Sequence, residues 1–240
     1  DVTDDYCVFG LFGPKSRELI KTLSNNNFDN EEFKFGTAKY IQINGINIWA
    51  QRLSYVGELG YELYVKFNQS KKIYESLIEK GKDFNLSNCG MHAMDIMRME
   101  SGFLHWGHDI SPEENQYQAG LSFAISYNKK IDFVGKKALE KIKNNKIKSR
   151  FAMFTLKESK PGEPLLLHDE PIYMEDKIIG RSTSGNYSFN FKKNLVFGYI
   201  KNDFKDDELN SKNLYIEVEK KKYPILFQSK PLKRTDFKNS

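Results

Sequence analysis

The residues best suited to chemistry lie in one short segment, Ser54–Val65, which reads Ser-Tyr-Val-Gly-Glu-Leu-Gly-Tyr-Glu-Leu-Tyr-Val. Gly57 and Gly60 allow a turn with conformations or close approaches that side chains would block. Tyr55 and Glu62 flank this turn. A carboxylate beside an aromatic ring suits a flat heterocycle with two adjacent N–H donors, because the carboxylate accepts both and the ring stacks. The residues alone still favour a plainer interpretation, a tight turn with surface carboxylates.

Two other clusters invite a chemical interpretation that their spacing does not support. His105 and His108 with Asp109 form a weakly specific metal-binding pattern, and no further ligand is obvious. We therefore predict no metal, and a structural or tunnel-lining role for these histidines and Trp106. The hydroxyl-rich stretch 182–185 has no base spaced to activate a nucleophile, so we predict a β-turn there.

The elements that position these residues follow from hydrophobic periodicity and turn signals. Asn44-Gly45 is a two-residue hairpin signal, Gly13-Pro14 opens a helix, and Ser70 is expected to cap another helix that runs to about Lys80. Further helices are predicted at 90–102 and 136–143. Strands are predicted at 8–12, 38–43, 46–50, 61–67, 151–156, 171–174, 195–200, 214–218 and 223–227.

The change of texture near Arg150 predicts two regions, residues 1–148 and 149–240. The first mixes helices and strands in an α+β arrangement. The second has short alternating strands separated by Gly, Pro and Asn turns, as in a small β-barrel or sandwich. A length of 240 residues is enough for two compact domains, or for three small ones that share segments.

Composition excludes several classes of partner. The 37 basic and 32 acidic residues give a net charge of +5, without the concentrated basic face and interleaved aromatics of a nucleic-acid-binding protein. No apolar stretch approaches the roughly 20 residues of a membrane span. Cys7 and Cys89 lie far apart, which favours a reducing intracellular compartment. The beginning at Asp1 is not that of a signal peptide and suggests a fragment of a longer chain.

Six further segments match one family in the family's order: 11–16, in which Phe12 replaces the usual Gln, 90–102, 103–110, 120–124, 132–139 and 183–185. Together with Ser54–Val65 they resemble the glycine-cleavage T-protein (aminomethyltransferase) family. The wording of 103–110, Phe-Leu-His-Trp-Gly-His-Asp-Ile, looks most like the C-terminal folate-binding region of dimethylglycine and sarcosine dehydrogenases. The resemblance covers nearly the whole chain.

The resemblance implies an α+β fold of two interlocked α/β (ferredoxin-like) subdomains and a C-terminal β-barrel around a folate cavity. By position, Tyr55 and Glu62 fall on the pterin-contacting Tyr and Glu of the family. Arg98 falls on a folate-site arginine, for which the structural alternative is an intrahelical pair with Asp95. Arg234 lies near a family arginine that approaches the ligand from the barrel, although its spacing from the preceding proline differs by one residue.

The catalytic residue implied by the family is an Asp in its N-terminal segment. Asp4 and Asp5 fall after that position by their spacing to Gly13-Pro14, so the catalytic residue is unknown and expected before Asp1. The chain has no dinucleotide-binding fingerprint. Any FAD therefore belongs to a presumed flavin domain upstream.

The function implied is the tetrahydrofolate-binding, one-carbon-transferring region of an N-methyl amine dehydrogenase that forms 5,10-methylenetetrahydrofolate. The expected partners are folate, an iminium or aminomethyl donor, and the flavin domain. The expected location is the cytoplasm, or the mitochondrial matrix in a eukaryote. Two alternatives stay open: a stand-alone glycine-cleavage aminomethyltransferase, against which Trp106-Gly-His108 counts, and a non-catalytic folate-binding regulatory module.

Overall fold

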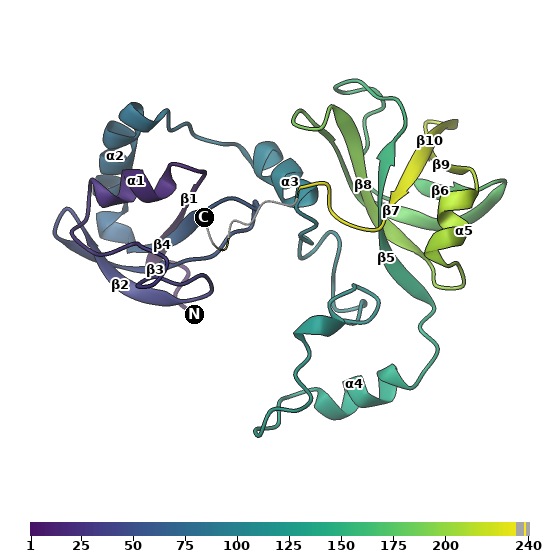
Figure 1. Cartoon of the computed structure of the whole chain (residues 1–240), viewed down its shortest axis with the longest axis horizontal. Coiled ribbons are helices and arrows are strands. Elements are labelled where there is room, and N and C mark those ends of the chain that lie inside the picture. The colour runs from purple at the N-terminus through teal and green to yellow at the C-terminus, as the bar shows by residue number, and fades with distance from the viewer. Residues whose placement is uncertain (234–237, 239–240) are drawn as a thin grey trace. The chain divides into compact units, whose positions relative to one another are not determined.

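The computed structural model of the chain describes residues 1–233 and Lys238. It divides into two compact units (Figure 1). The sheet unit comprises Asp1–Arg98 with the residues from Lys233 onward, and the barrel unit comprises Met99–Leu232. The division falls inside a helix, and the predicted domain limits 1–148 and 149–240 stay a prediction.

The sheet unit is built on an antiparallel sheet of four strands in the order β1-β4-β3-β2. The hairpin between β2 and β3 turns at Asn44-Gly45, where both residues have positive φ (48° and 79°), as the sequence predicts. The inner strand β4 pairs with β1 over its whole length and with β3 from Glu62 to Tyr64. The strands are β1 Tyr6–Phe12, β2 Ala38–Ile43, β3 Ile46–Gln51 and β4 Gly60–Lys66.

Helices α1 (Ser16–Lys21) and α2 (Phe67–Gly81) pack on one face of this sheet. A short 3₁₀ turn, Lys82–Phe84, and helix α3 (Met91–Glu100) follow. The prediction that Ser70 caps α2 is wrong. The helix begins at Phe67, and the Ser70 hydroxyl donates to the Phe67 carbonyl oxygen at 2.7 Å inside the first turn.

The two faces of the sheet have different residues because side chains alternate along each strand. On β4, the buried side chains Tyr61, Leu63 and Val65 belong to the core with α1 and α2, whereas Glu62 and Tyr64 on the opposite side are half-buried. We call this second side the helix-free face.

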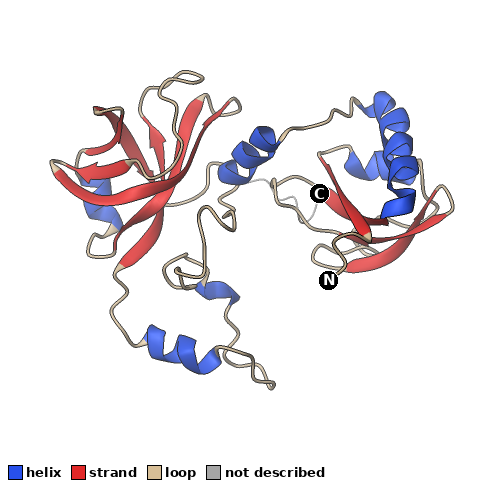
Figure 2. Ribbon diagram, turned by 180° about the vertical axis from the view of Figure 1, so that it is seen from behind, coloured by secondary structure: helices blue, strands red, loops and turns tan. Residues whose placement is uncertain are grey.

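The barrel unit contains a closed antiparallel barrel of strand order β10-β5-β8-β7-β6-β9, drawn in red in Figure 2. Its core consists of apolar side chains that point inward, such as Phe154, Val196 and Ile216. No helix among the described residues is long and apolar enough to cross a membrane. The strands are β5 Ser149–Leu156, β6 Pro171–Met174, β7 Lys177–Ser188, β8 Lys193–Lys201, β9 Leu214–Val218 and β10 Lys221–Gln228, and the helical segments are Ser122–Ala124 (3₁₀), α4 Lys136–Lys143 and α5 Asp206–Ser211.

The structure confirms the predicted strands of this region and decides between barrel and sandwich in favour of a closed barrel. The β-turn predicted at 182–185 is wrong, because these residues lie within the long strand β7. The pairing of β7 with β8 shifts register between Ser182 and Ser184, so a bulge accounts for the short polar residues that suggested a turn.

Candidate functional site

The turn between β3 and β4 needs both of its glycines. Gly57 has φ +66°, a conformation that other residues rarely adopt. A β-carbon at Gly60 would lie 2.1 Å from Cδ1 of Phe12 and 2.6 Å from the carbonyl oxygen of Leu11. One glycine therefore supplies a special conformation and the other a close approach, as predicted from the sequence.

This turn is fastened to the beginning of α1. The Leu59 carbonyl oxygen accepts hydrogen bonds from the Gly13 amide at 2.8 Å and from the buried Ser16 hydroxyl at 3.1 Å. Within the turn, the Glu58 amide donates to Ser54 Oγ at 3.0 Å. The sequence motifs at 11–16 and 54–62, which lie far apart in the chain, therefore form one structural feature.

An ion pair between Glu58 and Lys233 closes the turn from the C-terminal side. Their side chains are only 25% and 12% exposed, so the pair is shielded from water more than a typical surface pair. Neither residue could be predicted from a local sequence pattern, because they are 175 positions apart in the chain.

Glu62 lies on the helix-free face of β4, beside the turn, and is half-buried. Its neighbours across the sheet are Gly10 on β1 and Gln51 on β3. The Tyr64 hydroxyl donates to Glu62 Oε2 at 2.9 Å. Burial raises the pKa of Tyr64, and the adjacent Glu62 carboxylate raises it further, so the phenol is a neutral donor at physiological pH.

The other predicted ligand residues are Tyr55, Arg98 and Arg234. Tyr55 is half-buried within the turn, so Tyr55 and Glu62 belong to the same turn-and-strand segment. Arg98, on α3, is buried, and its Nε and Nη2 donate to Asp95 Oδ1 at 2.9 and 2.8 Å. This is the intrahelical pair of the structural alternative, and a folate contact of Arg98 stays a prediction. Arg234 lies outside the described residues.

Arg52 directly follows β3, at the start of the turn, and its side chain is held by backbone hydrogen bonds. Its side chain is 1% exposed, and Nη1 donates to the Phe33 carbonyl oxygen at 2.6 Å while Nη2 donates to that of Lys238 at 3.1 Å. Burial, followed by repulsion from Arg17, lowers the pKa of Arg52. A buried guanidinium bonded to backbone carbonyls indicates a structural role.

In the barrel unit, the histidine segment is organised around Asp109. The buried Asp109 carboxylate accepts hydrogen bonds from the Thr183 hydroxyl at 2.5 Å, the Ser184 hydroxyl at 2.8 Å and the His105 amide at 2.9 Å. The rings of His105 and His108 lie 4.4 Å apart. No group of three or more potential ligands is arranged to hold a metal ion in the part of the chain that the structure describes. Asp109 attaches this segment to β7.

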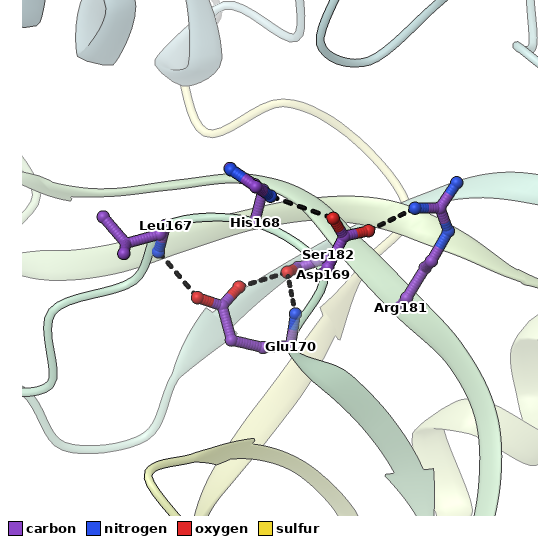
Figure 3. A network of polar contacts seen from close by, with 6 residues as sticks. All are labelled: Leu167, His168, Asp169, Glu170, Arg181 and Ser182. Carbon is purple, nitrogen blue, oxygen red and sulfur yellow. Dashed lines mark hydrogen bonds and ion pairs between the residues drawn. The ribbon is translucent and has the colours of Figure 1, made fainter.

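A second polar network fixes the loop before β6 to β7 (Figure 3). Asp169 pairs with Arg181 and, at 2.9 Å, with His168 Nδ1, and these two neighbours lower the pKa of Asp169. Glu170 accepts from the Leu167 amide at 2.7 Å and from the Ser182 hydroxyl. The serine that could suggest a nucleophile therefore serves to anchor a loop.

Comparison with known proteins assigns both parts of the chain to one family. Residues 1–129 match the family model of the GCVT N-terminal domain, and residues 150–233 match that of the glycine cleavage T-protein C-terminal barrel domain. A crystal structure of the glycine cleavage system aminomethyltransferase T from Bartonella henselae superimposes with a TM-score of 0.79 over 95% of this chain and 59% of that chain, at 22% identity. The predicted T-protein-like α+β fold with a C-terminal barrel is thereby confirmed.

Curated relatives extend the likeness along the whole sequence. The mitochondrial dimethylglycine dehydrogenase of Homo sapiens is 32% identical over 98% of this chain and 27% of its own length. The formaldehyde-forming 4-methylaminobutanoate oxidase of Paenarthrobacter nicotinovorans is 37% identical over 78% of this chain and 22% of its own length. An aminomethyltransferase of Halothermothrix orenii is 32% identical over 84% of this chain and 54% of its own length.

The chain thus spans about a quarter of the dehydrogenase and oxidase relatives and about half of the aminomethyltransferase. The family matches cover both structural features described above. One is the turn that joins the 11–16 and 54–62 motifs, and the other is the closed barrel after residue 148. The chain belongs to the glycine cleavage T-protein family of aminomethyltransferase-like proteins.

Proposed function

We propose that this chain is the tetrahydrofolate-binding, one-carbon-transferring region of an N-methyl amine dehydrogenase. The observation that carries the proposal is the match to dimethylglycine dehydrogenase over 98% of the chain. A mitochondrial sarcosine dehydrogenase of Homo sapiens, 30% identical over 83% of the chain and 21% of its own length, supports the same choice. The amine substrate is then of the dimethylglycine or sarcosine type.

The hydrogen-bond acceptor on the helix-free face, the Glu62 carboxylate, suits a pterin. A pterin presents a ring N–H and an exocyclic amino group side by side, and a carboxylate can accept both. Glu62 is half-buried beside a tight turn, and its hydrogen bond with Tyr64 occupies only part of the acceptor capacity of a carboxylate. Tyr55, in the same turn-and-strand segment, supplies an aromatic face.

Tetrahydrofolate, when bound, would supply the nucleophilic nitrogen that takes up the one-carbon unit of the iminium, with release of the demethylated amine, to give 5,10-methylenetetrahydrofolate. The residues of this chain bind and orient the pterin: Glu62 accepts its N–H groups, and Tyr55 limits the access of water to one side. Holding two reactants in a fixed geometry accelerates their reaction, and excluding water prevents loss of the one-carbon unit as formaldehyde.

The first alternative is a stand-alone aminomethyltransferase, favoured by the likeness to the enzyme of Halothermothrix orenii. The second is a folate-binding module without catalysis. Product analysis separates all three. The natural protein is incubated with dimethylglycine or sarcosine and an electron acceptor, with and without tetrahydrofolate, and both formaldehyde and 5,10-methylenetetrahydrofolate are measured.

An N-methyl amine dehydrogenase consumes the amine in both incubations, and tetrahydrofolate converts the product from formaldehyde to 5,10-methylenetetrahydrofolate. If the amine is not consumed, but an aminomethyl group on a lipoyl carrier gives 5,10-methylenetetrahydrofolate, the stand-alone transferase is the correct function. Folate binding without either reaction leaves the non-catalytic module.

A further inference from the structure

The donor to the Glu62 carboxylate is itself held in place by the sheet. Tyr64 lies two residues beyond Glu62 on the inner strand β4, so both side chains project from the helix-free face. In the register of the sheet, Tyr64 lies between Val8 of β1 and Trp49 of β3. Trp49 in turn packs edge-to-face against Tyr40, with ring centroids 4.9 Å apart. The phenol is therefore flanked on both sides.

On the side of β1, the surroundings of Glu62 differ from those of Tyr64. The residue opposite is Gly10, which has no side chain. The Phe12 ring occupies the space against Gly10 and Gly60, because a β-carbon at Gly10 would lie 2.4 Å from Cε2 of that ring. Gly10 and the apolar Phe12 ring offer no side-chain hydrogen bond to the Glu62 carboxylate, so neither of these two residues fixes its rotamer. The hydrogen bond from Tyr64 to Oε2 selects the rotamer.

We infer that Tyr64 is a positioning residue of the ligand site, whose hydroxyl holds the Glu62 carboxylate in the orientation that receives the two N–H groups of the pterin. This inference rests on the proposed folate-binding function. A side chain ordered before the ligand arrives loses less conformational entropy on binding, so preorganisation appears as affinity. Tyr64 touches the carboxylate and acts through it.

The test is a double-mutant cycle in the natural protein, with 5-formyltetrahydrofolate as the probe and its dissociation constant as the measurement. Tyr64→Phe removes only the hydroxyl and is expected to weaken binding roughly 3- to 10-fold, the effect of one hydrogen bond. Glu62→Ala is expected to weaken binding more. Because Tyr64 acts through Glu62, the double variant is expected to bind as weakly as Glu62→Ala alone.

Tyr40→Phe is the matched control, since it removes the same atom from an exposed tyrosine on the same face and is expected to leave affinity unchanged. If Glu62→Ala leaves no measurable binding, Glu62→Gln replaces it in the cycle. A purely structural role of Tyr64 would instead lower the midpoint of thermal unfolding and weaken binding by the same factor in both backgrounds, and this result would overturn the inference.

Failure of the inference and failure of the proposed function give different binding results. If the wild-type protein binds the probe and Glu62→Ala weakens it while Tyr64→Phe has no effect, the inference is wrong and the proposed function stands. If the wild-type protein does not bind the probe, the proposed function fails and the inference fails with it.

Discussion

The two units differ in how deeply their polar side chains are buried and in how these side chains are hydrogen-bonded. In the sheet unit, strand β4 buries one face and leaves Glu62 and Tyr64 half-buried on the other. In the barrel unit, every residue of β8 from Asn194 to Ile200 is buried, on both faces of the strand. Buried carboxylates of the barrel unit are instead hydrogen-bonded by neighbouring side chains, as Asp109 is by Thr183 and Ser184.

This difference distinguishes polar residues that are suited to binding a ligand from polar residues that stabilise the fold. A half-buried carboxylate with acceptor capacity remaining can meet a ligand, whereas a fully buried carboxylate with several internal donors is committed to the fold. Buried Glu100 repeats the pattern of Asp109. It accepts from the Ser188 hydroxyl and, at 2.9 Å, from Nδ2 of the Asn190 side chain. Changes in the barrel unit should therefore affect stability, and changes on the helix-free face should affect binding.

The largest effect is expected from Asp109→Ala. This change leaves the buried hydroxyls of Thr183 and Ser184 without their acceptor and should destabilise the barrel unit by about 3 kcal/mol. Urea unfolding measures the difference, and Asp176→Ala, at a fully exposed aspartate, serves as the control. A loss below about 0.5 kcal/mol, the usual range of a surface substitution, would show that Asp109 is not committed to the fold.

Gly60→Ala should affect both stability and binding. The new methyl group would meet the Phe12 ring and the Leu11 carbonyl oxygen, so the turn must shift, at a cost of about 1–3 kcal/mol. Folate affinity should fall with it, since Glu62 lies two residues after Gly60 on the same strand. Gly90→Ala is the matched control, because a β-carbon there meets nothing within 4 Å. Equal effects of the two substitutions, by urea unfolding and ligand titration, would contradict this account of the turn.

Tyr199 offers a pH test of the barrel unit. Burial, together with the charges of Glu114 and Asp109, raises the pKa of Tyr199, and its hydroxyl has no hydrogen-bond partner among the described residues. The neutral phenol therefore stabilises the fold fully below the ordinary pKa of about 10, and this contribution is lost as the pH rises above it. Tyr199→Phe should retain stability at neutral pH within about 1 kcal/mol.

Unfolding curves measured from pH 8 to pH 11 check this prediction. The wild-type protein should lose stability relative to Tyr199→Phe only in the alkaline part of the range. Parallel pH dependence of the two proteins would mean that Tyr199 is not protected from ionisation in the fold.

The smallest effect is expected from Arg181→Ala. The side chains of Arg181 and Asp169 are 60% and 54% exposed, so their ion pair should contribute at most about 1 kcal/mol. Because the pKa of Asp169 is lowered, its contribution is present above the ordinary carboxyl pKa and is lost as the pH falls through the lowered value. Acid unfolding should show wild type and variant converging at low pH, and a constant difference would assign the effect to packing.

Local patterns in the sequence predicted much of the fold, for local physical reasons. The Asn44-Gly45 hairpin and the strands of the barrel follow from turn chemistry and alternation, which act over a few residues. Strand β7 was not predicted because its short hydroxyl residues at 182–184 resemble a turn. Their acceptors are distant in the sequence: Glu170 for Ser182, and Asp109 for Thr183 and Ser184. Ser70 failed as a cap because Phe67 already begins the helix.

The position of the candidate site could be predicted from the sequence, but the contacts that hold its turn in place could not. Tyr55 and Glu62 were found through a motif, and the structure places both on one turn-and-strand segment. The attachment of this turn to Ser16 and the ion pair of Glu58 with Lys233 depend on residues distant in the chain. Tyr64 could have been found, because alternation along a strand puts residues two apart on the same face.

The most direct test of the central claim is the affinity of the natural protein for 5-formyltetrahydrofolate, with and without the Glu62 carboxylate. Glu79→Gln on α2 provides a control, since it removes an exposed carboxylate from a helix on the other side of the sheet. We predict that Glu62→Gln weakens binding by roughly 10-fold or more, as expected for loss of a charged hydrogen-bond acceptor, and that Glu79→Gln has no effect. Equal affinities for wild type and Glu62→Gln would contradict the assignment of the helix-free face as the pterin site.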